Sequence, residues 1–172
     1  MTRCIASLTI AALLVSGTFA PARAQSPPPG AVVNGLYTWY FATAQRKHPW
    51  TRDLTEARRF LEPGLYTLLR SAIAYDTAHH SADIIDVDPF ADAQIPATSA
   101  SLGAPIAETG RVLVPVRLGY GRGTVRTVRV SVRRTGAAWY VADIIGEGGS
   151  LRDLLVTNFR RVHAAPAGAT RP

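Results

Sequence analysis

Cysteine is nearly missing from this sequence of 172 residues. The chain contains one, Cys4, close to the N-terminus. A single thiol forms no disulfide within its own chain, and thiolate metal sites combine several cysteine or histidine ligands at set spacings. The sequence therefore excludes a disulfide-stabilised scaffold, and we expect the hydrophobic core to supply the stability.

Long apolar runs are also scarce, and the one that stands out indicates export. The run from Ile5 to Phe19 has no charge, follows Arg3 and precedes a small-x-small cleavage site at residues 22–24. It is shorter than the roughly 20 residues that a membrane-spanning helix needs. We expect residues 1–24 to be a signal peptide cleaved after Ala24, which leaves a periplasmic or secreted protein with no stable membrane insertion.

Acidic residues are few in the C-terminal part of the chain. Residues 111–172 hold eleven Lys/Arg against three Asp/Glu, whereas residues 25–110 hold six against nine. Such asymmetry accompanies binding to nucleic acid, to anionic surfaces or to acidic ligands, and it also occurs on plain solvated faces. Because we expect export, we expect no nucleic-acid partner.

Hydrophobic periodicity predicts helices at both ends of the domain. Apolar residues recur at spacings of three and four from Val33 to Ala44, then on both sides of a break at residues 62–64, and again after Ser150. Pro63 suits the first turn of a helix, where its missing N–H costs nothing. Ser150, with Asp153 three residues later, is typical of a helix cap.

Between these helices the period changes to two, which predicts antiparallel strands at 111–120, 124–134 and 138–145, with a weaker strand near 98–106. Pro115 cannot donate to a ladder, so its strand is an edge there or carries a bulge.

We therefore predict one α+β domain at residues 31–163, with N-terminal helices packed on a curved antiparallel sheet and a short C-terminal helix. Residues 25–30 are expected to be a flexible, proline-rich lead-in, and residues 164–172 a disordered tail.

Three short aromatic and acidic segments carry a family resemblance. They are residues 37–41 (YTWYF), residues 88–90 (DPF) followed by Asp92 and Gln94, and residues 139–144 (WYVADI) ahead of a Ser-Leu-Arg helix start. The chain resembles, over most of residues 31–160, an exported bacterial family of domains of unknown function. That family is similar in fold to nuclear transport factor 2, the cystatin-like cone. The resemblance implies this fold but no particular reaction, since the cone serves isomerases, dehydratases and binding modules.

Motifs for common chemistries are missing as well. The chain has no Gly-x-Ser-x-Gly segment, and its glycines at 119–123 have the wrong spacing for a dinucleotide fingerprint. A calcium loop beginning at Asp86 would need glycine where Ala91 stands. His79, His80 and the acids that follow are explained equally well by an exposed polar helix end. We expect no cofactor and no metal site.

Two acids are candidates for general acid/base catalysis, because burial among apolar residues would raise their pKa values toward working pH. These are Asp88 and Asp143, either of which could act with Tyr40. For each acid the structural interpretation is favoured: Asp88 as a turn before Pro89, and Asp143 as a strand-end hydrogen-bond acceptor.

Binding is the favoured function. We expect a non-catalytic module that binds a small ligand or an envelope component through its cone or its arginine face, and that could dimerise through the sheet face. The alternative is a small cone-type isomerase, dehydratase or hydrolase. The ligand-binding residues predicted from the sequence are Tyr37, Tyr40, Asp88, Trp139, Arg117 and Arg129.

Overall fold

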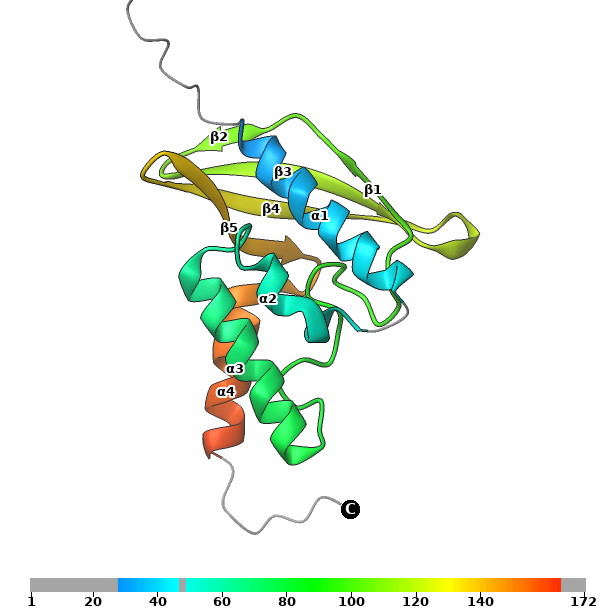
Figure 1. The fold of residues 1–172 in the computed structure, drawn as a ribbon, viewed down its shortest axis with the longest axis vertical. Helices are drawn as coiled ribbons and strands as arrows, with labels where there is room; N and C mark the ends of the chain where they lie inside the picture. Colours follow the sequence, from blue (N-terminus) through cyan, green and yellow to red (C-terminus); the bar gives the residue numbers. More distant parts are fainter. Residues whose placement is uncertain (1–27, 47–48, 165–172) are drawn as a thin grey trace, which may run out of the picture.

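A computed structural model describes residues 28–46 and 49–164 (Figure 1). The predicted signal peptide and the residues after 164 lie outside these ranges. The helices of the described chain are α1 (Pro29–Gln45), α2 (Leu54–Ala57), α3 (Pro63–His79) and α4 (Leu151–Ala164), with short 3-10 helices at Trp50–Asp53 and Gly121–Gly123. The strands are β1 (Ser99–Leu102), β2 (Ile106–Glu108), β3 (Arg111–Gly119), β4 (Val125–Thr135), β5 (Ala138–Gly146) and β6 (Gly149–Ser150).

The two long N-terminal helices both begin at a proline. Pro63 opens α3 as predicted, and Pro29 opens α1. This start places residues 29 and 30 in a helix rather than in the flexible lead-in predicted for 25–30. The reason is that proline fixes φ near its helical value and lacks only a donor that the first turn leaves unused.

All six strands form one antiparallel sheet in the order β1-β3-β4-β5-β6, with β2 also paired to β3. The predicted weak strand is two strands, because the partner of β3 is interrupted opposite Pro115. β1 pairs with residues 116–119 and β2 with residues 111–113, so no ladder bond is required of the Pro115 nitrogen. Pro115 therefore lies in a strand that is paired on both sides. On one side it faces the gap between β1 and β2.

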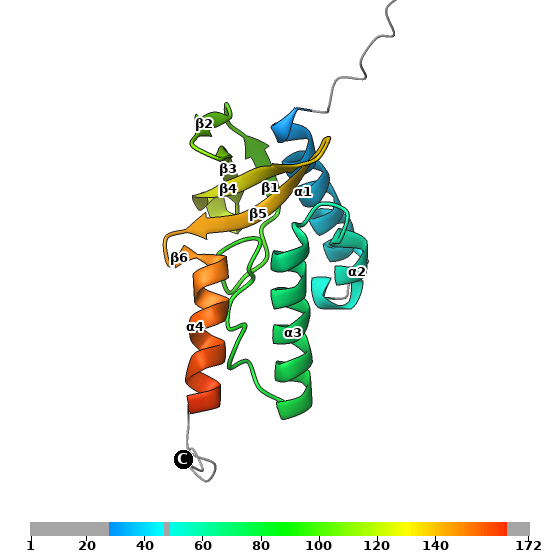
Figure 2. The same cartoon turned by 90° about the vertical axis from the view of Figure 1, so that its left-hand side faces the viewer.

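The helices occupy two positions around this sheet. α1 lies across one face, whereas α3 and α4 lie side by side beyond the β5 end (Figures 1 and 2). The core fills the space between α1 and the sheet, with Val33, Leu36, Tyr37 and Tyr40 of α1 buried in the same cluster as the valines of β3 and β4. These arrangements confirm the predicted α+β class.

The other face of the sheet has no helix over it among the described elements (Figure 2). The alternation predicted from the sequence places Arg117, Arg129 and Arg133 on this face, and all three are exposed. Within the described part of the chain, no helix combines the length and the apolar character needed to cross a membrane.

Candidate functional site

Asp88 and Tyr40 form a hydrogen-bonded pair, as the catalytic hypothesis requires. Tyr40 donates its hydroxyl hydrogen to Asp88 Oδ2 at 2.7 Å, and the Phe90 backbone N–H donates to Asp88 Oδ1 at 2.9 Å. Burial raises the pKa of Asp88, although the hydrogen bonds from Tyr40 and the backbone oppose the rise. Burial also raises the pKa of Tyr40. Both carboxylate oxygens are therefore engaged within the protein.

Two more tyrosines hold the segment that follows Asp88. Tyr37 donates to the carbonyl of Phe90 at 2.9 Å, and Tyr120 donates to the carbonyl of Ala91 at 2.5 Å. The Phe90 side chain is fully buried. Residues 88–91 are thus a corner fixed by three tyrosine hydroxyls from two different parts of the chain.

Asp88 and Tyr40 are not among the residues that line four pockets of this structure. These pockets are the groove described below and the smaller ones around Asp92, Ser150 and His80. Asp88 and Tyr40 have the contacts of a structural pair, and their placement offers a substrate no access through these pockets.

Asp143 anchors the start of α4. Its Oδ1 accepts the backbone N–H groups of Ile144 at 2.9 Å and Arg152 at 3.0 Å, and its Oδ2 accepts the Ser150 hydroxyl at 2.6 Å. Ser150 Oγ in turn accepts the N–H of Asp153 at 3.1 Å, which is the predicted helix cap. An anion at a helix N-terminus also interacts favourably with the helix dipole.

The structure does not bring the predicted ligand-binding residues together. Tyr37 and Tyr40 are buried in the core, and Trp139 lies partly buried at the margin of that core. Arg117 and Arg129 are exposed on the opposite face of the sheet. The predicted residues thus divide into a buried corner and an exposed row.

The histidine and aspartate cluster does not converge either. The His79 ring stacks on Tyr75, with ring centroids 4.0 Å apart, and His80 ends α3 in the left-handed conformation with φ of 51°. Among the described residues, no three His, Cys, Asp or Glu side chains lie close enough together to hold a metal ion.

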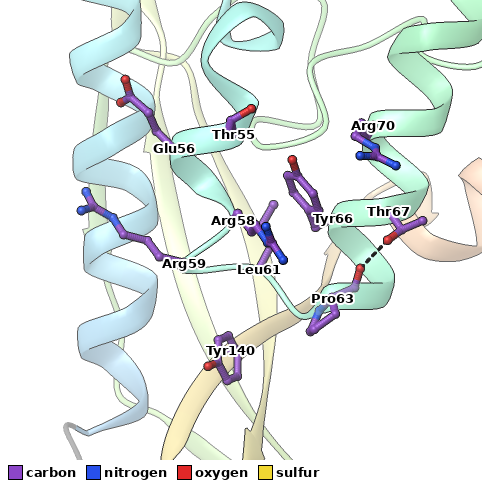
Figure 3. Close-up of a pocket in the computed structure, with 10 residues that line it drawn as sticks. All are labelled: Thr55, Glu56, Arg58, Arg59, Leu61, Pro63, Tyr66, Thr67, Arg70 and Tyr140. Atoms are coloured by element: carbon purple, nitrogen blue, oxygen red, sulfur yellow. Dashed lines mark hydrogen bonds between the residues drawn. The ribbon is translucent and has the colours of Figure 1, made fainter.

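A groove of about 990 Å³ opens where α2, α3 and the edge of β5 meet (Figure 3). The residues that line it are polar, aromatic and basic: Thr55, Glu56, Arg58, Arg59, Leu61, Pro63, Tyr66, Thr67, Arg70 and Tyr140.

The groove depends on a short segment, residues 60–62, that runs beside β5 between α2 and α3. The Val141 N–H donates to the Phe60 carbonyl at 2.8 Å, and the Glu62 N–H donates to the Val141 carbonyl at 2.8 Å. These bonds pair Leu61 with Val141 as one parallel bridge. This pairing therefore holds the residues just before Leu61 beside Tyr140.

Two of the groove's arginines lie close to Tyr66. The Arg58 guanidinium lies 5.8 Å from the centre of the Tyr66 ring. Arg70 follows Tyr66 by one helical turn on α3, so the two share a face, and Figure 3 shows Arg58 and Arg70 on either side of Tyr66. Arg59 instead extends toward α1, with its guanidinium 4.7 Å from the Phe60 ring centre.

The groove carries a net positive charge. Among the described residues, Arg58, Arg59 and Arg70 have no carboxylate within ion-pair distance. The single acid of the lining, Glu56, is already paired with Arg46 at 3.2 Å. Guanidinium groups present fixed forks of N–H donors that match carboxylate and phosphate oxygens.

No sequence pattern predicted this groove. Its arginines precede the basic C-terminal part, and its lining comes from segments far apart in the chain. The available signals were the adjacent Arg58 and Arg59 and the one-turn spacing of Tyr66 and Arg70. Neither signal predicts Tyr140 as a neighbour, because that contact depends on the bridge between Leu61 and Val141.

Comparisons with known proteins add one similar structure. A chain in the crystal structure of the type VI native effector-immunity complex Tae3-Tai3 from Ralstonia pickettii has 19% sequence identity and a TM-score of 0.49, over 72% of this chain and 96% of that chain. No family model and no curated protein matches the sequence. The resemblance to the exported cone family therefore stays a prediction.

Proposed function

We propose that this protein is an exported, non-catalytic module that binds an anionic ligand of the cell envelope in the groove between α2, α3 and β5. The observation that carries the proposal is the set of arginines without a carboxylate partner beside partly buried aromatic rings, with Arg58 and Arg70 flanking Tyr66. Carboxylate or phosphate groups would accept hydrogen bonds from both guanidiniums while an apolar part of the ligand contacts the ring.

A binding function is favoured over catalysis by the contacts of the candidate acids. Asp88 holds a corner and Asp143 holds the start of α4, so both oxygens of each carboxylate accept hydrogen bonds that maintain the fold. The groove offers one acid, Glu56, and that acid is paired with Arg46.

Isothermal titration with citrate and with inorganic pyrophosphate tests the groove. The double variant Arg58→Gln/Arg70→Gln should bind the better of the two probes at least about tenfold more weakly, because each charged hydrogen bond contributes roughly 1.5–3 kcal/mol. Arg52→Gln/Arg160→Gln removes the same charge from exposed positions outside the groove and should change affinity less than about twofold. Equal losses in the two variants would contradict the proposal.

Export has its own test. The intact mass of the protein recovered from outside the cytoplasm should correspond to a chain that begins at Gln25. A mature protein that retains Met1 would contradict this part of the proposal.

A further inference from the structure

Tyr140 belongs to two surfaces at once. It lines the groove, and it is also the cross-strand partner of Arg133 on β4. Directly opposed residues of an antiparallel pair project from the same face, with Cβ atoms about 4.5–5.5 Å apart. The groove therefore continues, through Tyr140, onto the face of the sheet that α1 leaves uncovered.

Three exposed arginines lie on this face beyond Tyr140. They are Arg117, Arg129 and Arg133, called the arginine row below. Among the described residues, none of the three forms an ion pair, whereas Arg111 beside them is paired with Glu108 at 2.7 Å. Burying such a row against a partner requires negative charge, since unpaired cations are costly to desolvate.

The spacing of the row matches an extended chain. Arg129 and Arg133 are four residues apart on one strand, which is about 13 Å. Arg117 is diagonal to Arg129 across β3 and β4, because Arg129 pairs with Pro115, and such neighbours lie about 7–8 Å apart. Acidic side chains at every second residue of an extended peptide repeat at roughly 7 Å. Two residues of such a peptide therefore span the distance from Arg117 to Arg129, and four span the distance from Arg129 to Arg133.

Two apolar side chains lie beside the row, one of them buried and one exposed. Leu113 points away from α1 yet is only 3% exposed, and its cross-strand partner Ile106 is 52% exposed. The Arg129 and Arg133 positions are diagonal to Leu113 across the β3–β4 pair, so their alkyl stems are placed to cover it. The face therefore offers charge and, at Ile106, an exposed apolar side chain.

We infer that the protein binds an extended acidic polypeptide, which runs from the groove past Tyr140 and along the arginine row. This inference rests on the proposed function and names the partner class for the groove. A small anion would fill only the groove. A second copy of this chain would bring a second arginine row against the first.

Fluorescence anisotropy with a labelled twelve-residue peptide of alternating Glu and Ser tests the inference. Arg129→Gln/Arg133→Gln should weaken peptide binding at least about tenfold and leave citrate binding in the groove unchanged. Arg52→Gln/Arg160→Gln is the control for net charge and should change peptide affinity less than about twofold. Glutamine keeps part of the stem over Leu113, and a thermal melt of each variant confirms that it folds.

A second peptide tests the spacing, with six Glu followed by six Ser. It carries the same charge without the alternation and should bind at least about threefold more weakly than the alternating peptide. Equal affinities for the two peptides would overturn the match between the row and an extended acidic chain.

The outcomes separate this inference from the proposed function. If the row variant binds the alternating peptide as tightly as the wild type while the groove variant loses citrate, the extended partner is wrong and the groove stands. If the groove variant retains citrate, the proposed function fails. If the row mediates binding to vesicles that contain an anionic phospholipid but not to the peptide, the partner is a membrane and the inference is overturned.

Discussion

At the scale of single residues, Asp88 illustrates how a buried acid can be structural. Its carboxylate accepts one hydrogen bond from Tyr40 and one from the Phe90 backbone, and its own N–H donates to the Ala93 carbonyl at 2.8 Å. Proline at position 89 keeps Asp88 out of helical geometry, which lets its side chain close the turn. The sequence predicted this corner and named Tyr40 as a partner for Asp88, whereas the hydrogen bonds of Tyr37 and Tyr120 to the corner are seen only in the structure.

The pH dependence of stability should reveal the buried carboxyl of Asp88. Its folded-state pKa is raised, so the stability that it contributes is fully present below its ordinary pKa of 3.8 and is lost as the pH rises through the folded-state value. In thermal melts between pH 3.5 and pH 7, wild type should therefore lose stability relative to Asp88→Asn as the pH increases. Asp153→Asn, at an exposed position on α4, is the matched control. A wild-type advantage that grows with pH would show that the charged form is the stabilised one.

At the scale of elements, α4 depends on an acid from the neighbouring strand. Asp143→Ala would leave the N–H of Arg152, the N–H of Ile144 and the Ser150 hydroxyl without their acceptor. The free energy of unfolding should fall by roughly 1–3 kcal/mol in denaturant titration. Asp153→Ala, in the same first turn, should cost less than about 0.5 kcal/mol. Similar losses from the two variants would mean that the Asp143 bonds contribute little.

The packing of α1 depends more on Phe90 than on Trp139. Phe90 is fully buried and contacts the rings of Trp39 and Trp50, with centroids 5.5 and 5.1 Å away, whereas Trp139 is only partly buried. Phe90→Ala should lower the free energy of unfolding by about 3–5 kcal/mol. Trp139→Ala should cost less, and denaturant melts that reverse this order would place the main aromatic contact on β5.

The helices and strands that could be predicted were those set by a pattern within their own stretch of sequence. The alternation of valine and arginine gave β3 and β4, and Pro63 marked the start of α3. The split between β1 and β2 was missed because it is set by Pro115 on another strand. The groove was missed for a related reason, since its lining converges only after Leu61 pairs with Val141.

At the scale of the whole molecule, positive charge lies on two connected surfaces. The groove contributes Arg58 and Arg70, and the arginine row continues from it through Tyr140. The formal net charge of the full chain is +7, so long-range attraction should speed encounter with any anionic partner and weaken with added salt. Local pairing then decides which surface the partner occupies.

The same charge distribution bears on the predicted homodimer through the sheet face. A two-fold dimer places the same patch of both subunits in contact, so the arginine row of one copy would meet that of the other. Like charges directly opposed are destabilising, and we expect sedimentation equilibrium to show a monomer at low salt.

Added salt at about 1 M shortens the screening length to about 3 Å and should favour any self-association through this face. Arg129→Gln/Arg133→Gln should associate more readily than wild type at low salt, with Arg52→Gln/Arg160→Gln as the control. A wild-type dimer that forms at low salt and dissociates as salt is added would show instead that ion pairs between subunits hold it together.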